Sequence, residues 1–272
     1  LCDRRQRQMC IRDRYISKDP GFGYWRDTHL RITGEAVMSL QIRFALDWNY
    51  ATGENLFKNE AYFRTDLKKK TDVRRDKERP AWPDPELEGS QVGMQIIASG
   101  PDAVSRQIRD NYIRLFAKAR DHIYIQTPYF VPDDAVLSAL SIAARSGVDV
   151  RLMIPCKPDH PFVYWATYSY AGDLIEAGAK CYVYDNGFLH AKGVMVDGRV
   201  SSYGTANMDI RSFELNFEVN ATIYDETITQ QLEQEFMNDL KHCREITKEV
   251  YESRSLLIRI KEQGSRLLSP LL

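Results

Sequence analysis

The sequence lacks an apolar run of the ~18 residues that a membrane-spanning helix requires. It also lacks a charge excess, because 37 basic and 38 acidic residues give a formal net charge of −1. Proteins that bind nucleic acid usually carry a basic surplus, so the composition gives no electrostatic support for a nucleic-acid partner.

Patterns for disulfides and metal sites are missing as well. The five cysteines are odd in number and form no CxxC pair, and the five histidines show no metal-ligand spacing. We therefore expect reduced thiols, as in the cytosol, with no zinc site and no cofactor. These residues are Cys2, Cys10, Cys156, Cys181 and Cys243, and His29, His122, His160, His190 and His242.

The most informative stretch begins at His190 and Lys192, which share a face if the segment is a strand. Residues 197–198 are Asp-Gly between apolar runs, which predicts a two-residue hairpin turn. Such a turn would pair His190 with Thr205 and bring Asn207 to the same surface. By residue type alone, ordinary solvated side chains are the commoner explanation. Together, a base, a cation, a hydroxyl and an amide are what a phosphoryl-transfer site needs.

The chain from residue 91 onward alternates short strands with helices. This order predicts an α/β layered fold, in which helices flank a mixed central sheet. The expected strands are 92–97, 122–126, 148–154 and 181–184, followed by the hairpin, and the expected helices are 102–118, 134–144 and 162–177.

A weak internal repeat connects the two ends of the chain. Asp27 opens an alternating stretch, 27–32, that precedes a helical pattern, and Glu218 opens a similar stretch, 218–223, before another helix. The repeat predicts two related lobes, of which the first is only a remnant.

These patterns predict a division of the chain into four parts. Residues 1–14 look foreign to the rest, as a non-native or disordered leader, with a basic arm as the alternative. Residues 15–63 are the expected remnant of the first lobe, and 91–272 the complete second domain. Between them, 64–90 is charged and Pro-rich, which favours a solvated linker over a basic patch that faces a membrane.

The full spacing H-x-K-x4-D-x6-G-T-x-N resembles the HKD signature of the phospholipase D superfamily, with Thr205 where serine is more usual. Several phrases resemble the bacterial cardiolipin synthases of that superfamily, over roughly residues 15–272. They are 24–29, 34–37, 127–133, 147–151, 187–192, 211–216 and 266–272. Members of this family carry two HKD motifs and N-terminal membrane helices. The resemblance therefore suggests the C-terminal portion of such a protein, without the first motif and those helices.

The resemblance also implies roles for the site residues. One imidazole attacks phosphorus and the other works as acid and base, and His190 is the expected acid–base member. Lys192, Asn207 and Thr205 would donate hydrogen bonds to the phosphate oxygens. The motif's Asp197 is expected to be structural.

Two carboxylates have implied roles beside the histidines. Glu218 is the residue expected to hold the His190 ring, as the carboxylate of a catalytic triad does. By the repeat, Asp27 is expected to hold the missing first histidine, with an ordinary strand-edge acid as the alternative. Aromatic side chains could line a lipid path or belong to the core: Tyr129, Phe130, Phe162, Tyr164, Trp165 and Phe188.

The implied reaction is phosphatidyl transfer between two phosphatidylglycerol molecules, with release of glycerol and a phosphohistidine intermediate. The implied partners are the phospholipid, the membrane surface, and a first-lobe half-site or a second copy of the chain. The implied location is the cytoplasmic side of the bacterial inner membrane. Two alternatives stay open, namely a phosphodiesterase or nuclease built as a homodimer of single-motif chains, and an inactive phosphate-binding fragment.

Overall fold

The computed structural model of the chain describes residues 21–59, 62–63, 92–157 and 159–271. The chain divides into two compact units, one holding residues up to Leu30 and from Met94 onward, the other Arg31–Gly93. The predicted first-lobe remnant, 15–63, is thus divided between the units at Leu30.

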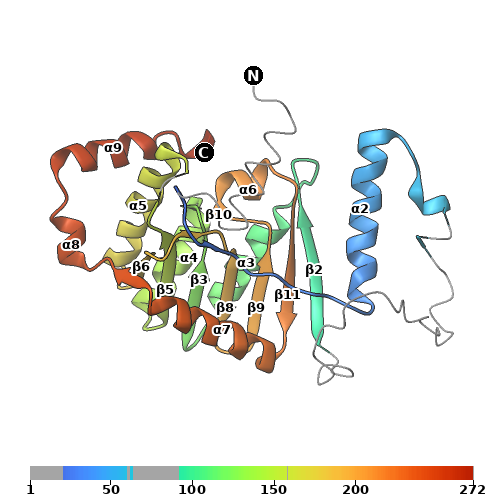
Figure 1. Cartoon of the computed structure of the whole chain (residues 1–272), viewed down its shortest axis with the longest axis horizontal. Helices are drawn as coiled ribbons and strands as arrows, with labels where there is room; N and C mark the ends of the chain where they lie inside the picture. The colour runs from blue at the N-terminus through green and yellow to red at the C-terminus, as the bar shows by residue number, and fades with distance from the viewer. Residues whose placement is uncertain (1–20, 60–61, 64–91, 158, 272) are drawn as a thin grey trace. The chain divides into compact units, whose positions relative to one another are not determined.

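An eight-stranded mixed sheet forms the centre of the larger unit (Figure 1). In spatial order its strands are β12 (Cys243–Glu245), β6 (Lys180–Tyr184), β5 (Asp149–Pro155), β3 (His122–Gln126), β8 (Gly193–Val196), β9 (Val200–Gly204), β11 (Glu218–Tyr224) and β2 (Gly93–Ser99). Strands β3, β5 and β6 are parallel, whereas β8, β9 and β11 run antiparallel to the neighbours that they pair with. The predicted mixed sheet is confirmed.

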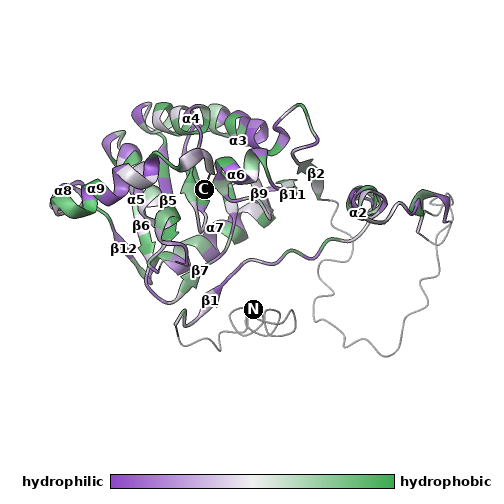
Figure 2. Cartoon of the chain, turned by 90° about the horizontal axis from the view of Figure 1, so that it is seen from above, coloured by the Kyte–Doolittle hydropathy of each residue, from purple (hydrophilic) through white to green (hydrophobic). Residues whose placement is uncertain are grey.

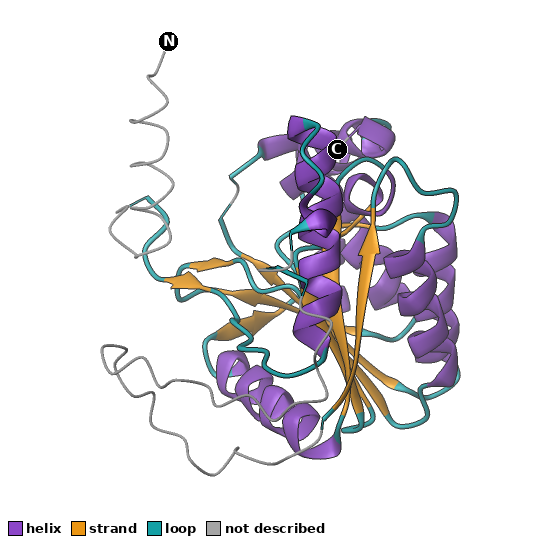
Figure 3. Cartoon of the chain, turned by 90° about the vertical axis from the view of Figure 1, so that its right-hand side faces the viewer, coloured by secondary structure: helices purple, strands orange, loops and turns teal. Residues whose placement is uncertain are grey.

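Helices cover both faces of this sheet (Figures 2 and 3). One face carries α3 (Gln107–Lys118), α4 (Asp134–Arg145) and α5 (Pro161–Glu176), and the other carries α7 (Glu226–Leu240). Strand alternation sorts the side chains between the two cores. Ile123 and Ile125 enter the core under the three helices, while Tyr124 between them stacks on Phe236 of α7 at 5.0 Å between ring centroids.

Local sequence explains where α4 begins and ends. Asp133 caps it by accepting a hydrogen bond from the backbone N–H of Val136 at 2.9 Å. After the helix the chain turns away at Gly147, whose φ of +94° suits a residue without a Cβ. Both signals were predicted from the sequence, and both are confirmed.

The hairpin between β8 and β9 differs from the prediction. Val196 pairs with Val200, so three residues rather than two form the turn. Asp197 and Gly198 both adopt positive φ, at 54° and 64°. The predicted pairing of His190 with Thr205 is therefore wrong by one residue. The cause is the third turn residue, which an Asp-Gly pair alone does not reveal.

The predicted strand at residues 27–32 is also wrong. The strand β1 covers only Trp25–Arg26 and pairs in parallel with β7 (Phe188–Leu189). After Arg26, whose carbonyl accepts hydrogen bonds from His190 and Ala191, the segment has no strand partner. An alternating pattern forms a strand only where a neighbouring strand supplies its hydrogen bonds.

The smaller unit contains α2 (Ala36–Thr52), which confirms the helical pattern expected after the stretch 27–32, and the short 3-10 helix η1 (Leu56–Lys58). Its expected neighbour in sequence, the charged segment 64–90, lies outside the described residues, as does the leader 1–14. Within the described ranges, no helix is both long and apolar enough to cross a membrane.

Short elements complete the larger unit. Strand β10 pairs in parallel with β4, and the remaining helical segments follow β10 and β12. They are β4 (Phe130–Val131), β10 (Met208–Asp209), α6 (Ile210–Glu214), α8 (Lys248–Glu252), α9 (Leu256–Arg266) and η3 (Ser269–Leu271).

Candidate active site

Most of the predicted site residues lie at one edge of the large sheet, where β8 and β11 begin and β9 ends. His190 and Lys192 come directly before β8, and Thr205 and Asn207 follow β9. Glu218 is the first residue of β11. Because β9 is antiparallel to both β8 and β11, these positions share one edge.

The His190 ring is held by a carboxylate and by aromatic side chains. Its Nδ1 lies 2.8 Å from Oδ2 of Asp27. The rings of Trp25 and Phe188 lie 4.9 and 6.3 Å away between centroids. Burial opposes the charged form of Asp27, but the hydrogen bond and charge of His190 outweigh it and lower the pKa of Asp27. A proton on Nδ1 places the ring's lone pair on Nε2.

The carboxylate that contacts His190 is therefore Asp27, and the expectation that Glu218 would do so is corrected. Oε1 of Glu218 instead accepts hydrogen bonds from Oγ of Ser212 at 3.3 Å and Nδ2 of Asn216 at 3.2 Å. The β1–β7 register explains the difference, because it places Asp27 in line with His190. The weak sequence repeat predicts that Asp27 and Glu218 are equivalent, but it does not predict which imidazole each one meets.

Lys192 places its ammonium against the same ring. Its Nζ lies 3.2 and 3.1 Å from Nδ1 and Nε2 of His190, and it donates to the carbonyl of His190 at 2.8 Å. Burial lowers the pKa of Lys192 to about 8, against the opposing pull of nearby carboxylates. These carboxylates are Asp27, Glu218, Asp209 and Asp159.

Asn207 and Thr205 reach the site edge in different ways. The backbone N–H of Asn207 donates to Oγ of Ser212 at 3.1 Å, and its buried Oδ1 has no hydrogen-bond partner among the described residues. The hydroxyl of Thr205 is occupied by β11, accepting from the N–H of Val219 at 2.9 Å and facing its carbonyl at 3.4 Å. The structure thus does not direct Thr205 toward His190, contrary to the sequence expectation.

The motif's aspartate, Asp197, lies at the opposite end of β8. Its carboxylate accepts three backbone hydrogen bonds, each 2.9 Å long, from Arg120, Asp121 and His122. Partial burial opposes its charged form, but these donors lower the pKa of Asp197. Its contacts tie the β8–β9 turn to the start of β3.

Asp209 is a site residue that the sequence analysis missed. It caps α6 by accepting a 2.6 Å hydrogen bond from the N–H of Ser212. Burial raises its pKa to about 6, with the charge of Glu218 acting in the same direction. The D-x-x-S spacing that starts at Asp209 is a helix-capping pattern and could have indicated it.

Comparison with known proteins identifies the family. A sequence family described as "Cardiolipin synthase, PLD-like domain" matches residues 112–240. The chain is 50% identical to the cardiolipin synthase of Oceanobacillus iheyensis over 262 residues, and 51% identical to the major cardiolipin synthase ClsA of Bacillus subtilis over 262 residues. Residues 112–240 therefore form a phospholipase D-like domain of the cardiolipin synthase family. Each alignment takes in 96% of this chain and 50% of the relative, so the chain spans about half the length of these curated relatives.

Solved structures agree with this assignment at the level of the fold. Nuc of Salmonella typhimurium, a phospholipase D family member, superposes with a TM-score of 0.51 at 18% identity, over 58% of this chain and 100% of that chain. Phosphatidylserine synthase of Haemophilus influenzae gives a TM-score of 0.55 at 16% identity, over 66% of this chain and 48% of that chain. The predicted phospholipase D-like fold is confirmed.

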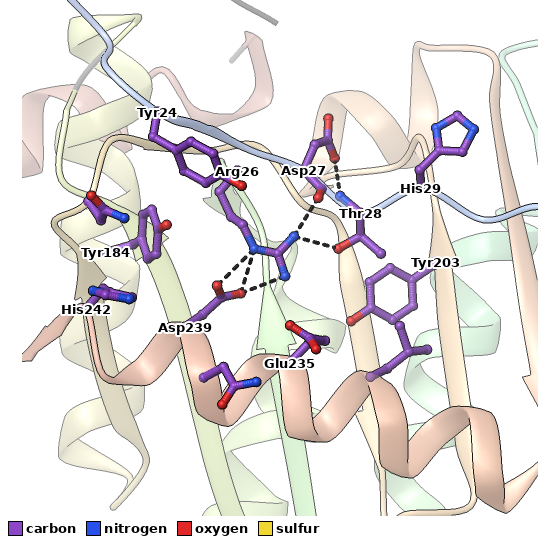
Figure 4. A pocket seen from close by; sticks show the side chains of 13 residues that line it. Tyr24, Arg26, Asp27, Thr28, His29, Tyr184, Tyr203, Glu235, Asp239 and His242 are labelled. Atoms are coloured by element: carbon purple, nitrogen blue, oxygen red, sulfur yellow. Dashed lines mark hydrogen bonds and ion pairs between the residues drawn. The ribbon is translucent and has the colours of Figure 1, made fainter. Parts of the chain in front are cut away.

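In this phospholipase D-like domain, a polar pocket of about 610 Å³ lies between the segment around β1 and α7 (Figure 4). Arg26 crosses it and bonds Asp239 through Nε at 2.9 and 3.0 Å, while Gln126 donates to the same carboxylate at 2.8 Å. Both members of the ion pair are largely buried. This pair fastens β1 to α7, and Asp27 follows directly at the pocket's rim. Arg26 thereby fixes the segment that presents Asp27 to His190.

The aromatic residues considered for a lipid path divide into three groups by their burial. Phe130 and Phe188 are fully buried and belong to the core. Phe162, in the first turn of α5, is 59% exposed. The others, Tyr129, Tyr164 and Trp165, are half-buried.

Proposed function

We propose that the chain supplies one half-site of a cardiolipin synthase, which moves a phosphatidyl group between two phosphatidylglycerol molecules and releases glycerol. The observation that carries the proposal is the cluster at His190, whose ring contacts Asp27 on Nδ1 and lies against the ammonium of Lys192. Identity of about 50% to curated cardiolipin synthases supports the choice of reaction.

The reaction proceeds in two steps on this proposal. An imidazole of the other half-site attacks phosphorus, and the bond from phosphorus to the glycerol oxygen breaks as His190 gives that oxygen a proton. The glycerol hydroxyl of a second phosphatidylglycerol then attacks the phosphohistidine and passes its proton to His190. Asp27 stabilises the imidazolium form of His190 before the first step and after the second, because its carboxylate accepts the Nδ1 proton.

Lys192 and Asn207 stabilise the charged phosphate oxygens. The pKa of Lys192, lowered to about 8 by burial, still leaves this ammonium mostly charged at neutral pH. An ammonium and an amide N–H₂ group donate to non-bridging oxygens, where charge develops in the transition state. Thr205 and Asp197 serve the scaffold, through the backbones of β11 and β3.

Glu218 receives a new role from this arrangement. Asp27 and Glu218 occupy equivalent positions of the repeat, and Asp27 holds His190. We therefore assign Glu218 to the imidazole of the other half-site, while Asp27 of this chain holds His190. The proximity of Glu218 to Lys192 supports this assignment.

The proposed setting is the cytoplasmic side of a bacterial membrane, where the phospholipid substrate is found. The three described cysteines Cys156, Cys181 and Cys243 are free thiols, as a reducing compartment allows. A homodimer of single-motif chains is the second arrangement that would complete the site.

Turnover of phosphatidylglycerol by the purified 272-residue chain tests whether the chain holds only half of the active site. We expect no multiple turnover at concentrations where ultracentrifugation shows a monomer, and cardiolipin formation once a first half-site is added. Ready turnover by the monomer would contradict the proposal of a half-site. Activity that rises with dimer formation would favour the homodimer.

A further inference from the structure

The helix α9 buries polar side chains and exposes apolar ones, which is the reverse of the usual arrangement. Its buried residues are the polar Glu262 and Ser265. Five large apolar side chains of α9 and the turn after it are exposed instead, by 38 to 85%: Leu256, Leu257, Ile260, Leu267 and Leu268. A surface helix normally turns its apolar side to the core. An exposed cluster of this kind indicates a binding surface.

Polar contacts, rather than apolar ones, account for how α9 is fastened to the domain. Glu262 pairs with Arg254 at 2.9 Å, and Arg266 pairs with Asp173 of α5 at 2.5 Å. Ser269, in the turn after the helix, accepts a hydrogen bond from the hydroxyl of Tyr170 at 3.1 Å. The leucines are therefore not needed to hold the helix in place.

Basic side chains flank the apolar face. At 100° per residue, Leu256, Ile260 and Leu257 span one arc of the helix, with Arg259 on one side of it and Lys261 on the other. Residues 253–272 carry four basic residues and a single acid, Glu262, which is buried. An apolar arc between cations, with no exposed acid on the helix, is the pattern of an interfacial helix on an anionic bilayer.

The helix lies at the same edge of the domain as the active site (Figure 1). The turn η3 that follows α9 packs against α6, the helix capped by Asp209. Lys261 lies 5.4 Å from the ring centroid of Trp165, and Arg266 lies 4.2 Å from that of Tyr170, so α9 packs against α5. The exposed Phe162 is at the start of α5, two residues after the loop that brings Asp159 near Lys192.

We propose that α9 and residues 267–268 form a membrane-contacting face that seats the catalytic edge on an anionic phospholipid bilayer. Its leucines and isoleucine enter the boundary between head groups and acyl chains, while Arg259 and Lys261 meet lipid phosphates. A second copy of the chain fits this face less well, because pairing two such helices would bring like charges together. The choice of a bilayer rests on the proposed lipid substrate.

Vesicle binding by the whole chain tests this face without requiring turnover. The test variant combines Leu256→Gln with Ile260→Gln, two exposed positions one helical turn apart. The matched control combines Val104→Gln with Ile142→Gln, which are at least as exposed but lie elsewhere in the domain. Binding is measured by co-sedimentation with vesicles of equal parts phosphatidylglycerol and phosphatidylcholine, and circular dichroism checks the fold of each protein.

We expect the α9 variant to lose at least tenfold in vesicle affinity and the control to bind like the parent chain. Replacing Arg259 and Lys261 by Gln should weaken binding to these vesicles but not to pure phosphatidylcholine. The proposal is overturned if the α9 variant binds like the parent, or if both variants weaken equally. It is also overturned if the parent ignores vesicles and forms a dimer that the α9 variant cannot form.

The outcomes separate this surface from the catalytic proposal. His190→Ala should bind vesicles like the parent chain, since His190 is not part of α9. In a synthase completed by a first half-site, the α9 variant should keep its turnover of short-chain phosphatidylglycerol in detergent and lose turnover on vesicles. Loss of turnover in detergent as well would contradict a purely membrane-contacting role.

Discussion

Replacing Asp197 by Ala should destabilise the domain without altering Lys192 and Asn207, the side chains proposed to bind phosphate. The change removes the acceptor of three backbone hydrogen bonds, from Arg120, Asp121 and His122, each 2.9 Å long. It leaves three N–H groups at the start of β3 without their protein partner. The turn residue also adopts φ of +54°, a conformation that Ala tolerates less well than Asp.

The expected cost follows from the number and exposure of these hydrogen bonds. A hydrogen bond to a charged group contributes about 1.5–3 kcal/mol when buried. Two of the three donors are exposed, so water replaces the carboxylate there, and only the bond to His122 is partly buried. We therefore expect a loss of about 2–3 kcal/mol, which corresponds to a fall of about 1 M in the midpoint of urea unfolding.

The pH dependence gives an internal check. The three donors lower the pKa of Asp197 in the folded chain, below the value of about 3.9 for an unfolded carboxyl. Its stabilising contribution is therefore fully present above about pH 4 and is lost as the pH falls through the folded pKa. The difference in unfolding free energy between the parent chain and Asp197→Ala should shrink below about pH 4.

Urea unfolding followed by circular dichroism measures both effects. Asp102→Ala serves as the matched control, because Asp102 lies in an exposed turn, and it should shift the midpoint by less than about 0.2 M. A difference of under 0.5 kcal/mol for Asp197→Ala, or one that does not change with pH, would refute the structural role given to the motif's aspartate.

Three further predictions concern the site. The ¹³Cε chemical shift of Lys192, followed by NMR, should change with a midpoint near pH 8 rather than 10.5. A midpoint above pH 10 would contradict the burial of this ammonium. Asp27→Ala should shift the ¹⁵N resonances of His190 toward a mixture of tautomers, whereas unchanged resonances would place the partner of Nδ1 elsewhere. Gly187→Ala should give the same NMR change, because an added Cβ would lie 2.0 Å from the carbonyl oxygen of Tyr24 and displace β1. Intact tautomer signals in that variant would show that β1 does not position Asp27.

Much of the fold could be predicted from local patterns. Helix α4 was predictable because its cap, Asp133, and its terminating Gly147 lie within the segment itself. The strands β3 and β5 were predictable because short, mainly apolar stretches between breakers are typical of buried strands. The convergence of His190, Lys192 and Asn207 on one edge followed from a spacing that few other sites share.

The features that failed depend on contacts between distant segments. The β8–β9 register depends on a third turn residue and on how Asp197 binds the start of β3. The carboxylate on His190 depends on β1 pairing with β7, over 160 residues away in sequence. Thr205 occupies a position of the HKD motif, yet its hydroxyl binds the backbone of β11 because that strand lies next to it. No periodicity in a single segment carries this information.

The most direct test of the central claim is cardiolipin formation by a synthase that contains this chain together with a first half-site. Labelled phosphatidylglycerol is supplied in detergent, and the parent protein is compared with His190→Ala, with circular dichroism as the check on folding. The account predicts that His190→Ala is folded and forms no cardiolipin. Cardiolipin formation by His190→Ala at the parent rate would contradict it.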